Sequence, residues 1–255
     1  MRTLLIMAAF FSFITRLFGA TETTPQSNTA EEHSLVKDAA KLGSDADRIR
    51  QMLFASQSLN EQVHQMHLDG TPGPFQTIAD ASKLIEAGKK SEAVARLRGV
   101  LDLPELETRI HLWVWSALRE QGQKPDPKFA FEVLGVIIEM PSGDGYDTLA
   151  AYVDGSARYL NYSGRAIFWD AEDAAIKSLC QSFVDSTIPV SSQAKPRTSL
   201  SLPKGNAQVT LLTRSGLYVI IDPPGPVVGA GAALMMELMK RLEKQKTSQV
   251  SGAHS

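Results

Sequence analysis

The spacing of hydrophobic residues divides the chain into two halves that meet near Pro127. Before this proline, apolar residues recur every three or four positions, which is the period of one face of an α-helix. After it, a nearly unbroken apolar run over 129–140 predicts a buried central strand, and shorter alternating segments follow. We therefore predict the α+β class, in which an N-terminal helical hairpin region over 35–127 packs on an antiparallel sheet covered by two helices over 128–246.

The first predicted helix begins near Ser44, which can cap it, and ends at the Gly- and Pro-rich break over 69–74. Its apolar positions follow the spacing of a heptad seam, with polar Ser56 near the middle. Such a seam packs either on the protein's own helices or on a second chain. We favour the first, so a monomer is predicted, with a dimer as the alternative. The candidate self-association seam consists of Ile49, Met52, Leu59, Val63 and Met66.

Two stretches of the helical half repeat each other 34 residues apart, which is the period of a helix-turn-helix repeat with a protein-binding surface. In the first stretch, a helical hairpin is predicted over 75–103, with its turn at Gly88. The repeated residues are Ile78, Ala81, Leu84 and Gly88, which recur as Leu112, Trp115, Leu118 and Gly122.

Residues 76–122 resemble the tetratricopeptide repeat. Ala81 stands at the family's small packing position, Gly88 at the turn between helices, and Pro104 close to the closing proline. The second copy departs from the family, because Trp115 replaces a small residue and prolines at 125 and 127 stand where its second helix should start. The resemblance implies binding to another protein; an ordinary helical hairpin with coincidental spacing is the alternative.

The second half predicts two hairpins and two helices. Asp154-Gly155 suits the tight turn between strands over 148–153 and 157–162, and a later hairpin over 207–222 turns at Ser215-Gly216. Asp170 is expected to cap a helix whose apolar face includes Cys180, and a last helix ends near 246, followed by a disordered tail over 247–255. The stretch from about 130 to 185 resembles bacterial proteins without an assigned role, a resemblance that supplies no chemistry.

The first 34 residues are predicted to be an apolar segment followed by a flexible linker. The segment over 4–18 can lie on a membrane as a short amphipathic helix, which predicts a peripheral membrane contact. Its basic start and apolar run also resemble a signal peptide, although Phe18 stands where a small residue is preferred. A cytoplasmic location, with membrane association, is therefore predicted, and export is the alternative.

Composition narrows the classes of partner. The 255 residues carry 26 Lys and Arg against 28 Asp and Glu, so the broad basic surface typical of nucleic-acid binding is not expected. The single cysteine, Cys180, excludes an internal disulfide and fits a reducing compartment.

No residue pattern predicts a catalytic, cofactor or metal site. Cys180 lies on an apolar helix face, where an inert thiol is expected. His64 and His67 share a spacing that can hold a metal, but only Asp69 stands nearby. His111 is expected to be a packing or surface residue. The glycines at 225, 229 and 231 match no phosphate-binding motif, and the aspartates at 144, 147, 154 and 170 stand at predicted turns and caps.

One polar group stands out as a candidate interaction surface. Alternation places Arg158 on one face of its strand and Tyr159 on the other, and Arg, Tyr and Trp are the residues typical of binding hot spots. An ordinary solvent-facing sheet is the alternative. The candidate residues are Arg158, Tyr159, Asn161, Tyr162, Arg165 and Trp169.

These features favour binding over catalysis. We predict an accessory or adaptor protein that binds a protein partner through the helical hairpin or through these strands. The alternative is a small-ligand sensor or hydrolase with a pocket between the sheet and the last helix, near 225–231.

Overall fold

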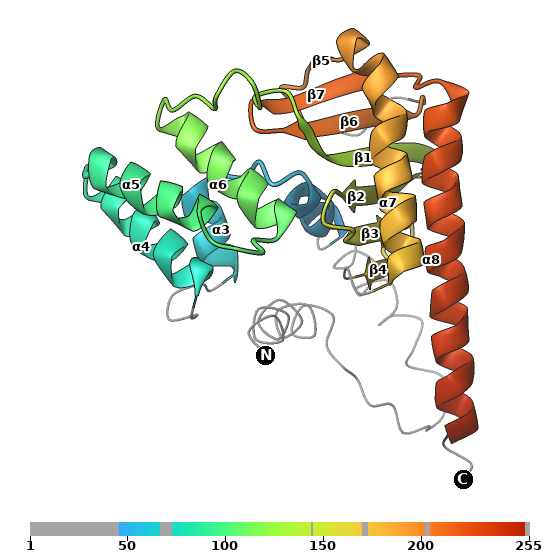
Figure 1. The fold of residues 1–255 in the computed structure, drawn as a ribbon. Coiled ribbons are helices and arrows are strands. Elements are labelled where there is room, and N and C mark those ends of the chain that lie inside the picture. Colours follow the sequence, from blue (N-terminus) through green and yellow to red (C-terminus); the bar gives the residue numbers. More distant parts are fainter. Residues whose placement is uncertain (1–45, 67–72, 144, 170–172, 202–204, 253–255) are drawn as a thin grey trace, which may run out of the picture.

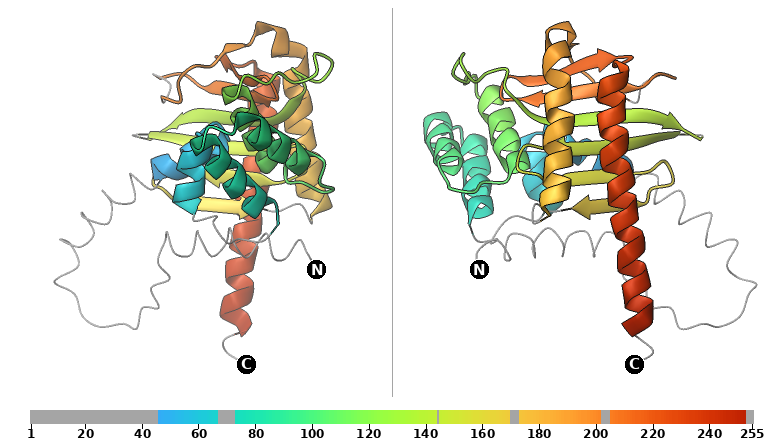
Figure 2. Two further views of the ribbon diagram at one scale, coloured as in Figure 1. Left: turned by 90° about the vertical axis from the view of Figure 1, so that its left-hand side faces the viewer. Right: turned by 45° about the vertical axis from the view of Figure 1, so that its right-hand side comes forward.

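The computed structural model describes residues 46–66, 73–143, 145–169, 173–201 and 205–252. Within them, helices and a seven-stranded antiparallel sheet confirm the predicted α+β class. The elements form three layers, with α3 to α6 on one side of the sheet and α7 and α8 on the other (Figures 1 and 2). The apolar segment over 4–18 and the linker to residue 34 lie outside the described residues. Among the described helices, none has both the length and the apolar character needed to cross a bilayer.

The helical region consists of five helices in the described part of the chain. A helix over 46–53 is followed by α3 (Leu59–Met66), α4 (Pro74–Glu86), α5 (Lys90–Leu101) and α6 (Thr108–Glu120). These helices, together with sheet residues Ile137, Tyr152 and Leu212, enclose one continuous hydrophobic core. The helical region therefore does not stand apart from the sheet; the two share buried side chains.

The prediction of one unbroken helix from near Ser44 to the break over 69–74 is wrong. The chain leaves the helix after residue 53, and Ala55 adopts a positive φ of 47°. Ser58 then starts α3 with a capping box: its hydroxyl accepts from the Glu61 N–H, and the Glu61 carboxylate accepts from the Ser58 N–H, both at 3.3 Å. The heptad spacing hid this cap, because the apolar positions on either side of the break kept the same period.

The break divides the seam residues between two helices, the helix over 46–53 and α3. Ile49, Leu59 and Val63 are buried inside the chain, and Met52 is half-buried. Burial within the chain is what the favoured intramolecular packing requires, and the side chain of Met66 lies outside the described part of the structure. The oligomeric state itself stays a prediction.

The 34-residue period corresponds to two equivalent helix ends. Gly88 follows α4 with φ 73°, and Gly122 follows α6 with φ 77°. In both places an N–H one residue beyond the glycine donates to a carbonyl in the last helical turn, at 2.8 Å after α4 and 2.9 Å after α6. However, α6 is followed by turns over 121–132 and then by a strand, so the tetratricopeptide resemblance stays a prediction.

Both predicted hairpins are present in the sheet, whose strand order is β4-β3-β2-β1-β6-β7-β5. The central strand begins later than predicted, because 127–131 forms turns that leave Phe129 and Phe131 exposed. The strands are β1 (Val133–Ser142), β2 (Gly145–Tyr152), β3 (Ala157–Leu160), β4 (Ala166–Trp169), β5 (Lys195–Pro196), β6 (Gln208–Thr213) and β7 (Gly216–Ile221).

Strand β1 supplies side chains to both cores. After a register shift between Val133 and Gly135, Val136 and Ile138 point toward α7 and α8, whereas Ile137 lies in the core of the helical region. Gly135 is required by close packing, since a Cβ there would lie 2.7 Å from the Tyr152 ring. The bulge therefore sets which residues of the central strand face which layer.

Two helices cover the far face. Asp173, and not the predicted Asp170, caps α7 (Ala174–Thr187), because its Oδ1 accepts from the N–H groups of Ala175 and Ile176 at 2.9 and 3.2 Å. Asp170 itself lies outside the described residues. A short 3₁₀-helix η1 (Ile188–Gln193) follows α7, and the last helix α8 (Gly225–Gly252) continues beyond the predicted end at 246.

Candidate functional site: a groove on the helical hairpin

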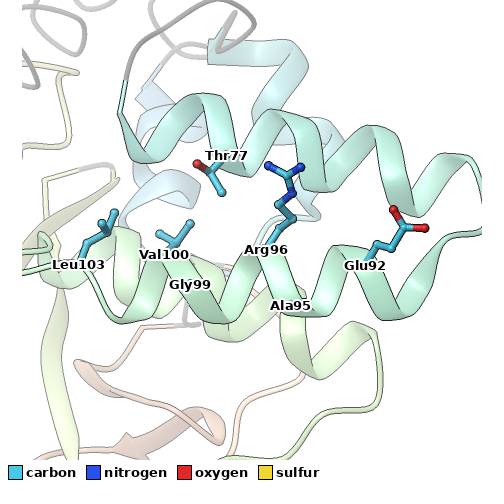
Figure 3. A pocket seen from close by; sticks show the side chains of 7 residues that line it. All are labelled: Thr77, Glu92, Ala95, Arg96, Gly99, Val100 and Leu103. Carbon is cyan, nitrogen blue, oxygen red and sulfur yellow. The ribbon is translucent and has the colours of Figure 1, made fainter.

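An open groove of about 530 Å³ runs between α4 and α5. These two helices form the part of the helical region farthest from the sheet (Figure 1). Figure 3 shows the Arg96 side chain reaching from α5 toward α4, with Glu92 at one end of the groove and Leu103 at the other. The lining residues are Thr77, Glu92, Ala95, Arg96, Gly99, Val100 and Leu103.

The groove exists because α5 presents two different faces. One face carries Ala93, Leu97 and Val100, which are almost fully buried in the core. The second face carries Glu92, Ala95, Arg96 and Gly99 at three- and four-residue spacing, with Val100 at its border and Leu103 just beyond the end of the helix. At its centre stand Ala95 and Gly99, whose small size leaves the space between the helices unfilled.

Gly99 is the residue that keeps the groove hollow. Its backbone is helical, and a Cβ added there would meet no atom within 4 Å. A glycine inside a helix costs roughly 0.5–1 kcal/mol relative to alanine. Neither the backbone conformation nor close packing requires glycine at this position.

The chemistry of the groove suits binding. Its floor is formed by alanine, glycine and the Val100 side chain, and Leu103 is 42% exposed at one end. Glu92 and Arg96 are exposed, so neither is held in the enclosed, fixed position that proton transfer favours. The groove offers an apolar surface with one anionic and one cationic side chain beside it.

The structure does not bring the six predicted strand residues to one surface. Arg158 and Tyr159 are only 4% and 8% exposed, and they lie on opposite faces of the sheet, as alternation predicted. Arg158 donates from Nη1 to the carbonyl oxygens of Ala157 at 2.8 Å and Trp169 at 2.6 Å. Tyr162 and Arg165 are exposed at the β3–β4 turn, Asn161 and Trp169 are partly buried, and their role in binding stays a prediction.

A fully buried carboxylate, Glu139 on β1, was missed by the sequence analysis. Its Oε1 accepts from Arg50 Nε at 2.6 Å, and its Oε2 accepts from Arg197 Nη1 at 2.9 Å and from Gln208 Nε2 at 2.6 Å. Both guanidinium groups lie over the Phe54 ring, at 5.4 and 4.7 Å from its centroid. The only sequence signal was a charged residue inside the apolar run over 129–140.

The Glu139 cluster holds three segments together. Arg50 also donates to the Leu200 carbonyl at 2.6 Å, and Arg197 donates to the Ser199 carbonyl at 2.9 Å. The cluster thus ties the helix over 46–53 and the segment after β5 to the sheet. Because its polar groups hydrogen-bond to one another and to the backbone, we assign the cluster a structural role.

A second polar cluster joins the β2–β3 turn to α6. Asp154 accepts from the N–H of Thr108 at 2.8 Å, and its other oxygen accepts from the Ser156 N–H and hydroxyl. Burial by itself would raise the pKa of Asp154, but these hydrogen bonds lower it below its ordinary value. Asp154 is thus a turn residue, as predicted, and it also caps a helix 46 residues away in the sequence.

Cys180, His111 and Gly231 were the remaining candidates for chemistry. Cys180 is buried, and burial raises the pKa of its thiol to about 12, so the reactive thiolate is disfavoured. Burial and nearby Arg214 lower the pKa of His111 to about 4. Gly231 packs against Phe183 and Ile138, where a Cβ would lie 3.3 and 3.4 Å away, as expected for close helix packing.

Several predicted positions fall outside the residues that the structure describes. Neither the His64 side chain nor any part of His67, Asp69 or Asp144 is described. Among the described residues, no three His, Cys, Asp or Glu side chains gather as a metal site would require.

Comparison with known proteins adds no relative: no protein-family model, curated protein or solved structure matches the chain.

Proposed function

We propose that this protein is a non-catalytic accessory or adaptor protein that binds a segment of another protein in the groove between α4 and α5. The observation that supports this proposal is the second face of α5, which is exposed, small at its centre and unused by the core. A hollow at this position costs helix stability, because alanine would fit there without a clash. Binding of a partner segment over Gly99 would explain why the hollow is kept.

The dimensions suit a short segment. From Glu92 to the end of α5 at Leu101 the helix rises by about 14 Å at about 1.5 Å per residue, and Leu103 follows the helix. This length matches two to three turns of an amphipathic helix, which can place apolar side chains over Ala95 and Gly99. Leu103 would supply an apolar contact at one end, and Arg96 a charged contact between the helices.

The test fills the groove and leaves the core unchanged. Affinity capture from the native cell is compared for the wild-type chain, for Gly99→Trp and for Ser91→Trp, an exposed position of α5 outside the groove. We expect Gly99→Trp to lose the captured partner and Ser91→Trp to retain it. Capture of the same partner by all three proteins would refute binding in the groove.

A smaller substitution separates binding from stability. Gly99→Ala should raise the stability of the protein by about 0.5–1 kcal/mol, because it improves helix propensity in open space. Melting temperatures of Gly99→Ala and Gly99→Trp, measured beside partner capture, show whether loss of binding in Gly99→Trp comes from the filled groove or from misfolding.

The competing class is a small-ligand sensor or hydrolase near 225–231. The close contact of Gly231 with Phe183 and Ile138 gives that class no support. A thermal-shift screen with nucleotides, metal ions and metabolites tests it directly. Strong stabilisation by a small molecule, without any captured protein, would favour the sensor or hydrolase.

A cytoplasmic location, with peripheral membrane contact through residues 4–18, belongs to the same proposal. Cell fractionation and sequencing of the mature N-terminus test it. Removal of the first twenty residues would favour export instead.

A further inference from the structure

The two edges of the sheet are built differently. At one edge stands β5, which has two residues, Lys195 and Pro196. A short strand, a lysine and a proline are all devices that prevent another strand from pairing. At the other edge stands β4, whose sequence Ala-Ile-Phe-Trp contains no charge and no proline. Its pairing with β3 is regular over all four residues.

Half of the backbone groups of β4 point away from the sheet. The Asn161 N–H donates to the Arg165 carbonyl at 2.9 Å, in the register that continues through the β3–β4 ladder. Because antiparallel hydrogen bonding alternates, Ile167 and Trp169 bond to β3, whereas the N–H and C=O of Ala166 and Phe168 point outward. In the described part of the chain, no strand pairs with this side of β4. Such a row of donors and acceptors is a template for a further strand.

We propose that this edge pairs with the β4 edge of a second copy of the chain, so that two sheets join across a two-fold axis at Ile167. Outward-pointing residues must face each other in an antiparallel ladder, which sets Ala166 opposite the partner's Phe168. Ile167 then faces the partner's Ile167, and Arg165 faces the partner's Trp169. The pairs combine small with large, apolar with apolar, and a cation with an aromatic ring.

The last helix favours a second copy over a single added peptide. Arg241 on α8 pairs with Asp173 at 3.0 Å, close to the end of β4, and α8 contacts β4. Beyond this point, residues 242–252 continue past the β4 edge (Figures 1 and 2). These eleven residues extend about 16 Å, whereas one added strand fills only about 4.8 Å of that width. Across this two-fold axis the partner's α7 and α8 cover the same face of the joined sheet, so the projecting segment of α8 would meet those helices, which a single added peptide does not supply.

The register makes the proposal testable by cross-linking. Residues that face each other in a non-hydrogen-bonded pair have Cα atoms about 4.5 Å apart, which a disulfide can span. Ile167→Cys should therefore form a disulfide-linked dimer under mild oxidation. Tyr162→Cys, at an exposed position that does not face its own copy, is the control. The native Cys180 is buried and does not take part.

Light scattering over a range of concentrations provides the second measurement. The wild-type chain should show dimers, and Ala166→Pro should be monomeric with an unchanged circular dichroism spectrum, because it removes an outward N–H and keeps the bonds to β3. If Ala166→Pro does not fold, the comparison of Ile167→Cys with Tyr162→Cys decides alone. A wild-type chain that is monomeric at every concentration overturns the proposal. Equal cross-linking of the two cysteine variants also overturns it.

Discussion

The two faces of the central sheet are stabilised in different ways. Toward α7 and α8, β1 places Val136 and Ile138 in a core of apolar side chains. Toward the helical region, the same strand places Ile137 in an apolar core but Glu139 in a buried network with two arginines and a glutamine. Adjacent residues of one strand therefore depend on different forces.

The difference shows how far each face depends on distant parts of the chain. An apolar side chain is stabilised by whatever apolar surface covers it, and many partners are equivalent. Glu139 needs donors in particular directions, and Arg50 and Arg197 lie 89 and 58 residues away in the sequence. The face toward α7 and α8 should tolerate conservative substitution, and the face toward the helical region should not.

The largest expected effect follows from removing the Glu139 charge. Glu139→Gln keeps the shape of the side chain but leaves two guanidinium groups buried without their carboxylate. Loss of one partner from a buried ion pair typically costs about 3–5 kcal/mol. Urea denaturation should show a decrease of this size in the free energy of unfolding.

Replacing the whole cluster sharpens this prediction. A triple variant with Glu139→Leu, Arg50→Met and Arg197→Met removes all three charges together, so none remains unpaired. It should regain most of the stability lost in Glu139→Gln. A triple variant as unstable as the single one would show that the hydrogen bonds to 199–201, and not the charges, hold this face together.

The second effect concerns the link between the β2–β3 turn and α6. Asp154→Ala should destabilise the protein by about 2 kcal/mol, because the Thr108 N–H at the start of α6 and the Ser156 N–H in the turn lose their acceptor. The folded-state pKa of Asp154 lies below its ordinary value, so its stabilising effect is present above the unfolded pKa near 3.8 and is lost as the pH falls through the folded pKa. The melting temperature of the variant should therefore change less between pH 5 and pH 3 than the melting temperature of the wild type.

The third effect is a loss of stability in mild acid caused by His111. Its folded-state pKa of about 4 lies below the ordinary value of 6.5, since burial and then Arg214 disfavour the charged form. The unfolded chain binds the proton first, so stability should fall as the pH drops from about 6.5 to about 4. Because the side chain is only partly buried, we expect a change on the order of 1–2 kcal/mol. His111→Gln should remove this slope, and a variant that keeps it would assign the effect to another group.

The smallest effect belongs to the apolar face. Ile138→Val removes one methylene from a fully buried side chain beside Phe183 and should cost about 0.5–1.5 kcal/mol. Urea denaturation of this variant beside Glu139→Gln compares conservative changes at neighbouring residues on opposite faces. An equal loss of free energy of unfolding in the two variants would show that the two faces of the sheet do not differ in this way.

The sequence by itself determined the elements whose signals are local. The change of apolar period near Pro127, the Asp154-Gly155 turn and the turn glycines at 88 and 122 each depend on a few neighbouring residues, and the structure contains them. The apolar face of α7 was also predicted correctly, because a helix that covers a sheet has to carry such a stripe.

Only the tertiary structure decided how these elements share their polar side chains and free surfaces. Arginine is a residue type common at binding sites, yet Arg158 is buried and donates hydrogen bonds to the carbonyl groups of Ala157 and Trp169. The groove at Gly99 needs α4 beside α5, and the open edge of β4 depends on which strand stands last in the sheet. The periodic pattern of apolar residues predicts which side chains are buried, because the tendency to be buried belongs to each side chain separately. Hydrogen bonds, ion pairs and grooves are properties of pairs, and only folding brings distant partners together.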